Sequence, residues 1–134
     1  MVLKQNKSLL EPYSHLFLDF DIFDFKFENG WIELVFDLCR TLDIYFSLYP
    51  DSDFLNFKII SLQEKFGCLE IESINSNETI DIILRATSLL SCKTCEKCGK
   101  LGQLYCSTKW LHWCDKKILC KTHAVQFRYY SIKA

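Results

Sequence analysis

The chain has little that would interrupt a folded core and nothing long enough to span a membrane. It has only four glycines and two prolines in 134 residues, and 49% of the residues are hydrophobic and 15% aromatic, which together exclude a disordered chain and leave few long loops. No segment approaches the ~18 apolar residues that a membrane span needs. The N-terminal stretch MVLKQNKSLLEPYSHLFLDF also lacks a continuous apolar run of signal-peptide length. We therefore expect a globular, cytoplasmic, reduced protein without membrane contact.

Several signatures of catalysis are missing as well. The chain has no HExxH, no glycine-rich phosphate loop and no His-x-Glu followed by Pro-Cys-x-x-Cys. No Ser/His/Asp or Cys/His pairing can be argued from linear spacing. These absences predict that the protein is not an enzyme.

Cysteine is abundant, and its spacing is the strongest signal in the chain. The eight cysteines include Cys95-x-x-Cys98, which is followed further along by Cys120-x-x-His123. Two such pairs are typical of a tetrahedral zinc site in which each pair forms a tight turn, or knuckle. Gly99 stands where such a turn needs a positive φ. An even cysteine count also suits disulfides, but the expected reducing compartment favours the metal.

Four of the other cysteines are not expected to bind zinc. Cys39 falls in a helical pattern and Cys68 in a strand pattern, where a small buried hydrophobe is the ordinary role. Cys106 and Cys114 lack a partner at knuckle spacing.

Two further residues remain open as zinc ligands. Cys92 would form an overlapping pair with Cys95, and His112 is an alternative fourth ligand. A catalytic zinc keeps a position open for water and has a carboxylate nearby as a base. Four protein ligands are available here, and Glu96 and Asp115 are the local acids, with Glu96 expected to face solvent. We therefore predict a structural Zn²⁺.

Hydrophobic periodicity predicts an α+β fold. Residues 15–28 alternate as a half-buried strand with a slip near Ile22, and Asn29-Gly30 marks a turn. From Trp31 the period becomes helical until Pro50. Further elements are expected as strands at 56–63 and 68–73, a helix capped by Ser76 or Asn77 that runs to about Ser91, and a last strand at 126–132. Together they predict a small antiparallel sheet, two amphipathic helices and a C-terminal lobe resembling a zinc ribbon.

Four segments of this chain resemble a family of small uncharacterised bacterial and phage proteins. They are GWIELVFDLC, LQEKFGCLEI, ATSLLSCKTCEKCGKLGQL and ILCKTHA. The family carries an EKFGGL strand pair and a terminal TCExCG…LCxxH unit. This resemblance implies Cys95, Cys98, Cys120 and His123 as the ligand set, and it implies no activity. The chain departs from the pattern at Cys68, which replaces the second glycine of KFGGL.

The net charge of −1 hides a strong asymmetry along the chain. Residues 1–90 hold fifteen acidic and seven basic residues, whereas residues 91–134 hold two acidic and nine basic residues. This division predicts an acidic body at 1–91 and a basic zinc-binding lobe at 92–134 that packs on it as one compact unit. Such a charge distribution bears on partners rather than on fold.

The acidic body suggests a protein partner. Asp19, Asp21, Asp24 and Glu28 do not match a calcium loop, because Phe23 and Phe25 occupy interleaved positions. We expect these acids on a solvated strand face and take them as the candidate partner-binding residues. An acidic binding module without catalytic groups is typical of an inhibitor or immunity protein that neutralises a basic toxin or defence effector.

The basic lobe suggests nucleic acid as the alternative partner. Its cations are interleaved with aromatic residues, and such side chains track phosphates and stack on bases. The acidic body would repel the same polyanion, and the aromatic residues are needed to bury the lobe. Nucleic-acid binding is therefore the second hypothesis. The residues concerned are Lys93, Lys97, Lys100, Lys109, Lys116, Lys117, Lys121, Arg128, Tyr105, Trp110, Trp113, Phe127, Tyr129 and Tyr130.

Overall fold

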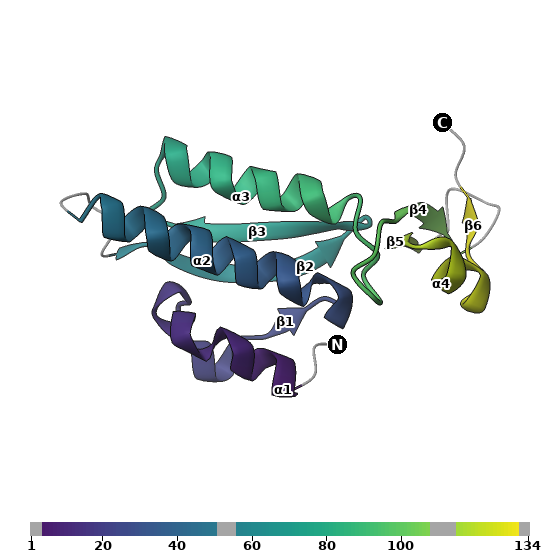
Figure 1. Ribbon diagram of the computed structural model, residues 1–134, viewed down its shortest axis with the longest axis horizontal. Coiled ribbons are helices and arrows are strands. Elements are labelled where there is room, and N and C mark those ends of the chain that lie inside the picture. The colour runs from purple at the N-terminus through teal and green to yellow at the C-terminus, as the bar shows by residue number, and fades with distance from the viewer. Residues whose placement is uncertain (1–3, 51–55, 108–114, 132–134) are drawn as a thin grey trace.

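The computed structural model describes residues 4–50, 56–107 and 115–131 and confirms an α+β fold (Figure 1). Helices and a three-stranded sheet form the larger part of the molecule, and a smaller lobe with its own sheet lies at one end. In chain order the elements are α1 (Lys4–Lys7), the 3₁₀ helices η1 (Ser8–Leu16) and η2 (Phe20–Ile22), β1 (Phe25–Lys26), the 3₁₀ helix η3 (Asn29–Trp31), α2 (Ile32–Leu48), β2 (Lys58–Lys65), β3 (Cys68–Ile74), α3 (Glu78–Ser91), β4 (Gln103–Cys106), β5 (Lys116–Leu119), α4 (Lys121–Gln126) and β6 (Tyr130–Ser131).

The body is built on a sheet with the strand order β1-β2-β3. The predicted hairpin is confirmed, because β2 and β3 pair antiparallel around a turn at Phe66 and Gly67, which both have positive φ. The expectation of a purely antiparallel sheet is wrong at one edge, where Phe25 and Lys26 pair parallel with Leu62 and Gln63. The sheet is therefore mixed, and β3 is its other edge.

The predicted strand over residues 15–28 is mostly wrong. Only Phe25–Lys26 is a strand, and the preceding residues form η1 and η2. Phe17 directly follows η1 and forms an isolated parallel bridge with Ile59, whereas Phe20 begins η2, which ends just before Phe23. Their rings pack on one another, with centroids 5.5 Å apart for Phe17–Phe20 and 4.8 Å for Phe17–Phe23. Packing between aromatic rings therefore overrides the apparent alternation.

The two predicted amphipathic helices are confirmed. Helix α2 ends at Leu48, two residues before Pro50. Helix α3 begins after Asn77, whose Oδ1 accepts a 2.8 Å hydrogen bond from the backbone N–H of Ile80. The inner face of α3 is buried at Ile80, Leu84 and Thr87, as its helical period predicts.

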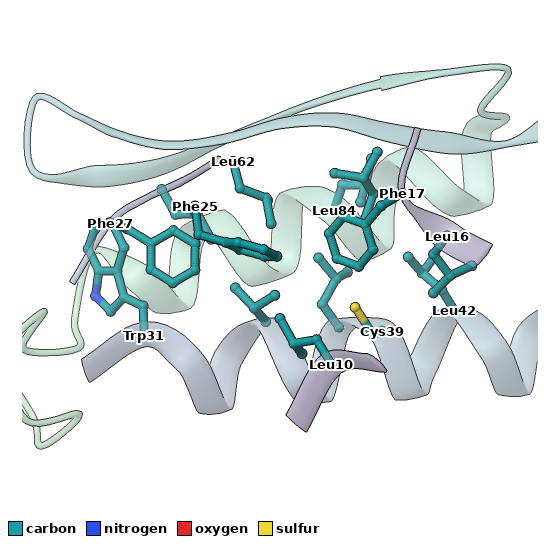
Figure 2. Packing of buried hydrophobic residues seen from close by; sticks show 14 of the residues in the cluster. Leu10, Leu16, Phe17, Phe25, Phe27, Trp31, Cys39, Leu42, Leu62 and Leu84 are labelled. Atoms are coloured by element: carbon teal, nitrogen blue, oxygen red, sulfur yellow. The ribbon is translucent and has the colours of Figure 1, made fainter. Parts of the chain in front are cut away.

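The core lies between the sheet and α2 (Figure 2). Trp31, Phe25 and Phe27 fill one end of this layer, whereas Leu16 and Leu42 fill the other. Cys39 is fully buried among them, as expected, and burial raises the pKa of its thiol to about 12. It is therefore an unreactive hydrophobe in the core.

The C-terminal lobe has its own antiparallel sheet, in the order β5-β4-β6. The expected strand at 126–132 is shorter than predicted, because α4 extends to Gln126 and β6 contains only Tyr130–Ser131. Within residues 4–50, 56–107 and 115–131, no helix has the combination of length and apolar character needed to cross a membrane.

A disulfide joins Cys68 to Cys92, whose Cα atoms are 5.0 Å apart. The sequence-based interpretation of Cys68 as a simple buried hydrophobe is therefore wrong, and Cys68 is in fact only partly buried. The two residues meet because β3 starts beside the end of α3, where Cys92 is the C-terminal cap. This pairing depends on tertiary structure, and linear spacing could not reveal it.

Candidate metal centre

The first pair of candidate ligands lies in a tight turn directly after α3. The backbone N–H of Cys95 donates to the Lys100 carbonyl at 2.7 Å, and the N–H of Gly99 donates to the Cys95 carbonyl at 2.8 Å. Gly99 has a φ of 79°, which confirms the conformation predicted for it. These bonds close the turn and bring the Cys98 side chain towards that of Cys95.

The second pair uses the first turn of a helix. Cys120 is the residue before α4, and its carbonyl accepts a 2.9 Å hydrogen bond from the N–H of Ala124. His123 lies within the first turn of α4, three residues after Cys120. Residues at this spacing lie on the same side of a helical turn, so both side chains reach one point.

The four side chains converge as a tetrahedral zinc site requires. Their ligand atoms all lie within 4.8 Å of one another. The Sγ atoms of Cys98 and Cys120 are 3.8 Å apart, and the Cys95 Sγ lies 3.6 Å from the His123 Nδ1. Zn–S bonds of about 2.3 Å at tetrahedral angles place sulfurs about 3.8 Å apart. Cys95, Cys98, Cys120 and His123 can therefore hold a metal ion, as the sequence predicted.

The protonation chemistry of Cys120 also suits a metal, whereas burial raises the pKa of Cys98. A hydrogen bond from the backbone N–H of His123 is the main cause that lowers the pKa of Cys120 to about 6. The Cys120 Sγ also lies 3.2 Å from the His123 Nδ1. Because zinc binds the thiolate, a thiol that ionises near neutral pH releases its proton readily to the metal.

The alternative ligands are resolved in part. Cys92 forms the disulfide with Cys68 and is therefore no ligand. His112 and Cys114 lie outside the described residues, as do Lys109, Trp110 and Trp113 of the basic-aromatic set.

Glu96 lies between the two cysteines of the first knuckle, and its environment differs from the predicted one more than that of any other candidate residue. Expected to face solvent, it is fully buried between the lobe and the body. Neither carboxylate oxygen accepts a hydrogen bond from the described residues, and Oε2 lies 3.6 Å from the Nζ of Lys117. Burial raises the pKa of Glu96 to about 7, against the opposing effect of Lys117. It faces a cavity of about 220 Å³ that Glu28 and Glu64 also line.

Backbone contacts join the first knuckle directly to the body. The Gly30 N–H donates to the Glu96 carbonyl at 2.6 Å, and the Trp31 Nε1–H donates to the Thr94 carbonyl at 2.8 Å. A Cβ at Gly30 would overlap the carbonyls of Cys95 and Glu96, so only glycine allows this approach. The metal-binding turn is therefore part of the same packed unit as the start of α2.

Two lysines of the lobe form ion pairs with acids of the body. Lys97 lies 3.2 Å from Glu28, and Lys117 lies 3.5 Å from Glu64. Partial burial opposes ionisation of Glu28, but charged donors that include Lys97 outweigh it and keep its pKa below the ordinary value. Part of the charge asymmetry along the chain is thus neutralised within the molecule.

The candidate partner-binding residues do not form one strand face. Asp19, Asp21 and Asp24 are exposed around η2, whereas Glu28 is half-buried against Lys97. Sequence reasoning missed the role of Lys117, because its contacts with Glu64 and Glu96 depend on how the lobe docks. All four acids stay candidates, and Glu28 in addition pairs with Lys97 within the protein.

Comparison with known proteins assigns the chain to no family. No family model matches it, and neither the curated proteins nor the solved structures contain a match. The resemblance in its KFG and TCExCG segments therefore stays a prediction.

Proposed function

We propose that the protein is a non-enzymatic, zinc-stabilised protein-binding module. The convergence of three thiols and one imidazole carries this proposal, because four protein ligands complete the tetrahedron of a structural zinc. The acid nearest in sequence, Glu96, is buried beside Lys117 in the interface between lobe and body. Bound zinc would stabilise the folded lobe, and the folded lobe would stabilise the body by packing against it.

The exposed acids of the body support a basic protein as the partner. Asp19, Asp21 and Asp24 are close in sequence to two strongly exposed apolar side chains, Leu18 and Ile22, with 61% and 80% of their surfaces accessible. Apolar anchors with charged neighbours are typical of protein interfaces. An immunity protein or inhibitor would use such a surface to cover the phosphate-binding site of a toxin or defence nuclease.

Nucleic-acid binding receives less support from the lobe. Lys97 and Lys117 are engaged by acids of the body, and Tyr105 is buried, so these residues do not form a free basic and aromatic surface. A labelled DNA duplex and a labelled single strand, titrated with zinc-loaded protein at about 150 mM salt, should show no binding. Micromolar affinity for either would contradict the proposal.

The partner surface is tested by capture and identification from a bacterial lysate. The wild-type protein should retain a basic protein that elutes with rising salt, and D19N/D21N/D24N should lose it. The matched control E11Q/E33Q/D37N removes three exposed acids elsewhere on the body and should retain the partner. Equal capture by both triple variants would contradict the proposed surface.

A further inference from the structure

The outer edge of the body sheet carries backbone groups that point away from β2. Strand β3 is the last in the order β1-β2-β3. At Leu69 the N–H donates to the Ser91 Oγ and the carbonyl accepts from the Ser88 Oγ, at 2.8 and 2.7 Å. Both groups of Leu69 therefore face outward. Because the direction alternates along a strand, Ile71 and Ser73 face the same way.

The two ends of this edge differ. Two serines of α3 satisfy the outward groups of Leu69, whereas no described residue forms a hydrogen bond with the outward groups of Ile71 or Ser73. These two residues line a groove of about 590 Å³ between β3 and α3, which Leu84 and Arg85 also line. The groove therefore offers two donors and two acceptors in the geometry of a missing strand.

The groove carries more negative than positive charge. Glu70, Glu72 and Asp81 line it together with Arg85 as the one cation among its lining residues. Glu70 also lies 3.7 Å from Lys65 in an exposed pair, and Asp81 accepts a hydrogen bond from Ser76. Glu72 is exposed. Glu70 and Glu72 are two residues apart, so both point to the same face of the sheet.

We propose that this groove binds an extended segment of a protein partner as an added strand beside β3. The segment carries Lys or Arg at alternate positions, since residues opposite Glu70 and Glu72 lie two apart. It is short, because Ser88 and Ser91 close the edge at Leu69. This inference rests on the proposed protein-binding function and adds the mode of recognition to it.

The test uses ¹⁵N-labelled, zinc-loaded protein and an acetylated, amidated hexapeptide of alternating threonine and lysine. Saturable shifts of the Ile71 and Ser73 amides are expected, and the corresponding glutamate peptide should produce none. E70Q/E72Q should weaken binding about tenfold, because two cross-strand charge pairs are lost. The control E11Q/E33Q should leave the affinity unchanged.

Proline at position 73 tests the main-chain contact separately from charge. Ser73→Pro removes an N–H that points outward, so the β2–β3 ladder is kept while the peptide loses one hydrogen bond. Binding should fall about fivefold. Ser73→Ala keeps the N–H and should bind like the wild type.

The outcomes separate this inference from the proposed function. Shifts confined to residues 18–24 would overturn the groove and leave the acidic surface as the binding site. Absence of any saturable shift at β3, or equal affinity of S73P and S73A, would also overturn the groove. Capture of the basic protein from a lysate tests the proposed function independently.

Discussion

At the residue scale, the candidate metal ligands were predictable and the role of Glu96 was not. The two C-x-x-[C/H] pairs indicate Cys95 and His123 by local spacing, although the same spacing left Cys92 open as an alternative. Glu96 lies in the same segment, but its burial depends on the close approach of Gly30, which no local pattern encodes. Local chemistry was therefore predictable, whereas the environment created by docking was not.

Glu96 should make stability depend on pH with a distinctive sign. Its pKa in the folded protein is about 7, above the ordinary value of 4.5. The unfolded chain then releases its proton first, so this group reduces stability as pH rises from 4.5 to 7. Relative to the wild type, Glu96→Gln should be more stable by about 1 kcal/mol at pH 5 and by up to about 3 kcal/mol at pH 8.

The measurement for Glu96 is urea unfolding of both proteins at fixed zinc concentration across this pH range. Subtracting the free energies of unfolding of the two proteins cancels the contribution of the zinc ligands, because these ligands titrate in both proteins. A difference that stays constant with pH, or grows towards low pH, would contradict the assigned environment.

At the element scale, long periodic segments were predictable and aromatic-rich short ones were not. Helix α3 was anticipated from its cap and its apolar period, because Asn77 and Ile80 signal both locally. The segment before Trp31 misled the prediction, since Phe20 and Ile22, and after them Phe23 and Phe25, fit an alternating pattern. The parallel pairing of Phe25 with Leu62 is set by tertiary packing. Periodicity therefore identifies long helices, whose backbone hydrogen bonds lie within the element, better than short elements whose structure depends on tertiary packing.

The cap of α3 gives a prediction at this scale. Asn77→Ala removes the side-chain acceptor of the Ile80 N–H and should lower the free energy of unfolding by about 1 kcal/mol. Ser76→Ala is the matched control, because the Ser76 Oγ bonds to Asp81 rather than to the helix backbone. Denaturant unfolding measures both, and an equal loss in the two variants would contradict the capping role.

At the scale of the whole molecule, the body and the lobe should depend on a bound metal to different degrees. The body has a large apolar core, whereas among the described residues the buried cluster of the lobe consists of Cys95, Tyr105, Leu119 and Ala124, with Cys120 and Tyr129 packed against it. Such a small core needs a metal or another cross-link to stay folded. The body is acidic and the lobe is basic, as predicted. The ion pairs Lys97–Glu28 and Lys117–Glu64 join the lobe to the body.

Removal of the metal should therefore unfold one part of the protein selectively. After excess chelator is added, backbone amides of β4 and β5 should lose their protection against hydrogen exchange, whereas those of β2 and β3 should keep it. Restoring zinc should restore the protection. Unchanged protection at Leu104 and Ile118 in chelator would show that the lobe folds without metal.

The most direct test is X-ray absorption at the zinc edge of the purified protein, together with its zinc content. One zinc per chain is expected, with three sulfurs at about 2.3 Å and one nitrogen at about 2.0 Å. Cys120→Ala should lose the zinc, and Cys39→Ala, which removes a thiol outside the site, should retain it. A chain without stoichiometric zinc, or a zinc with an oxygen ligand from water, would contradict a closed structural centre.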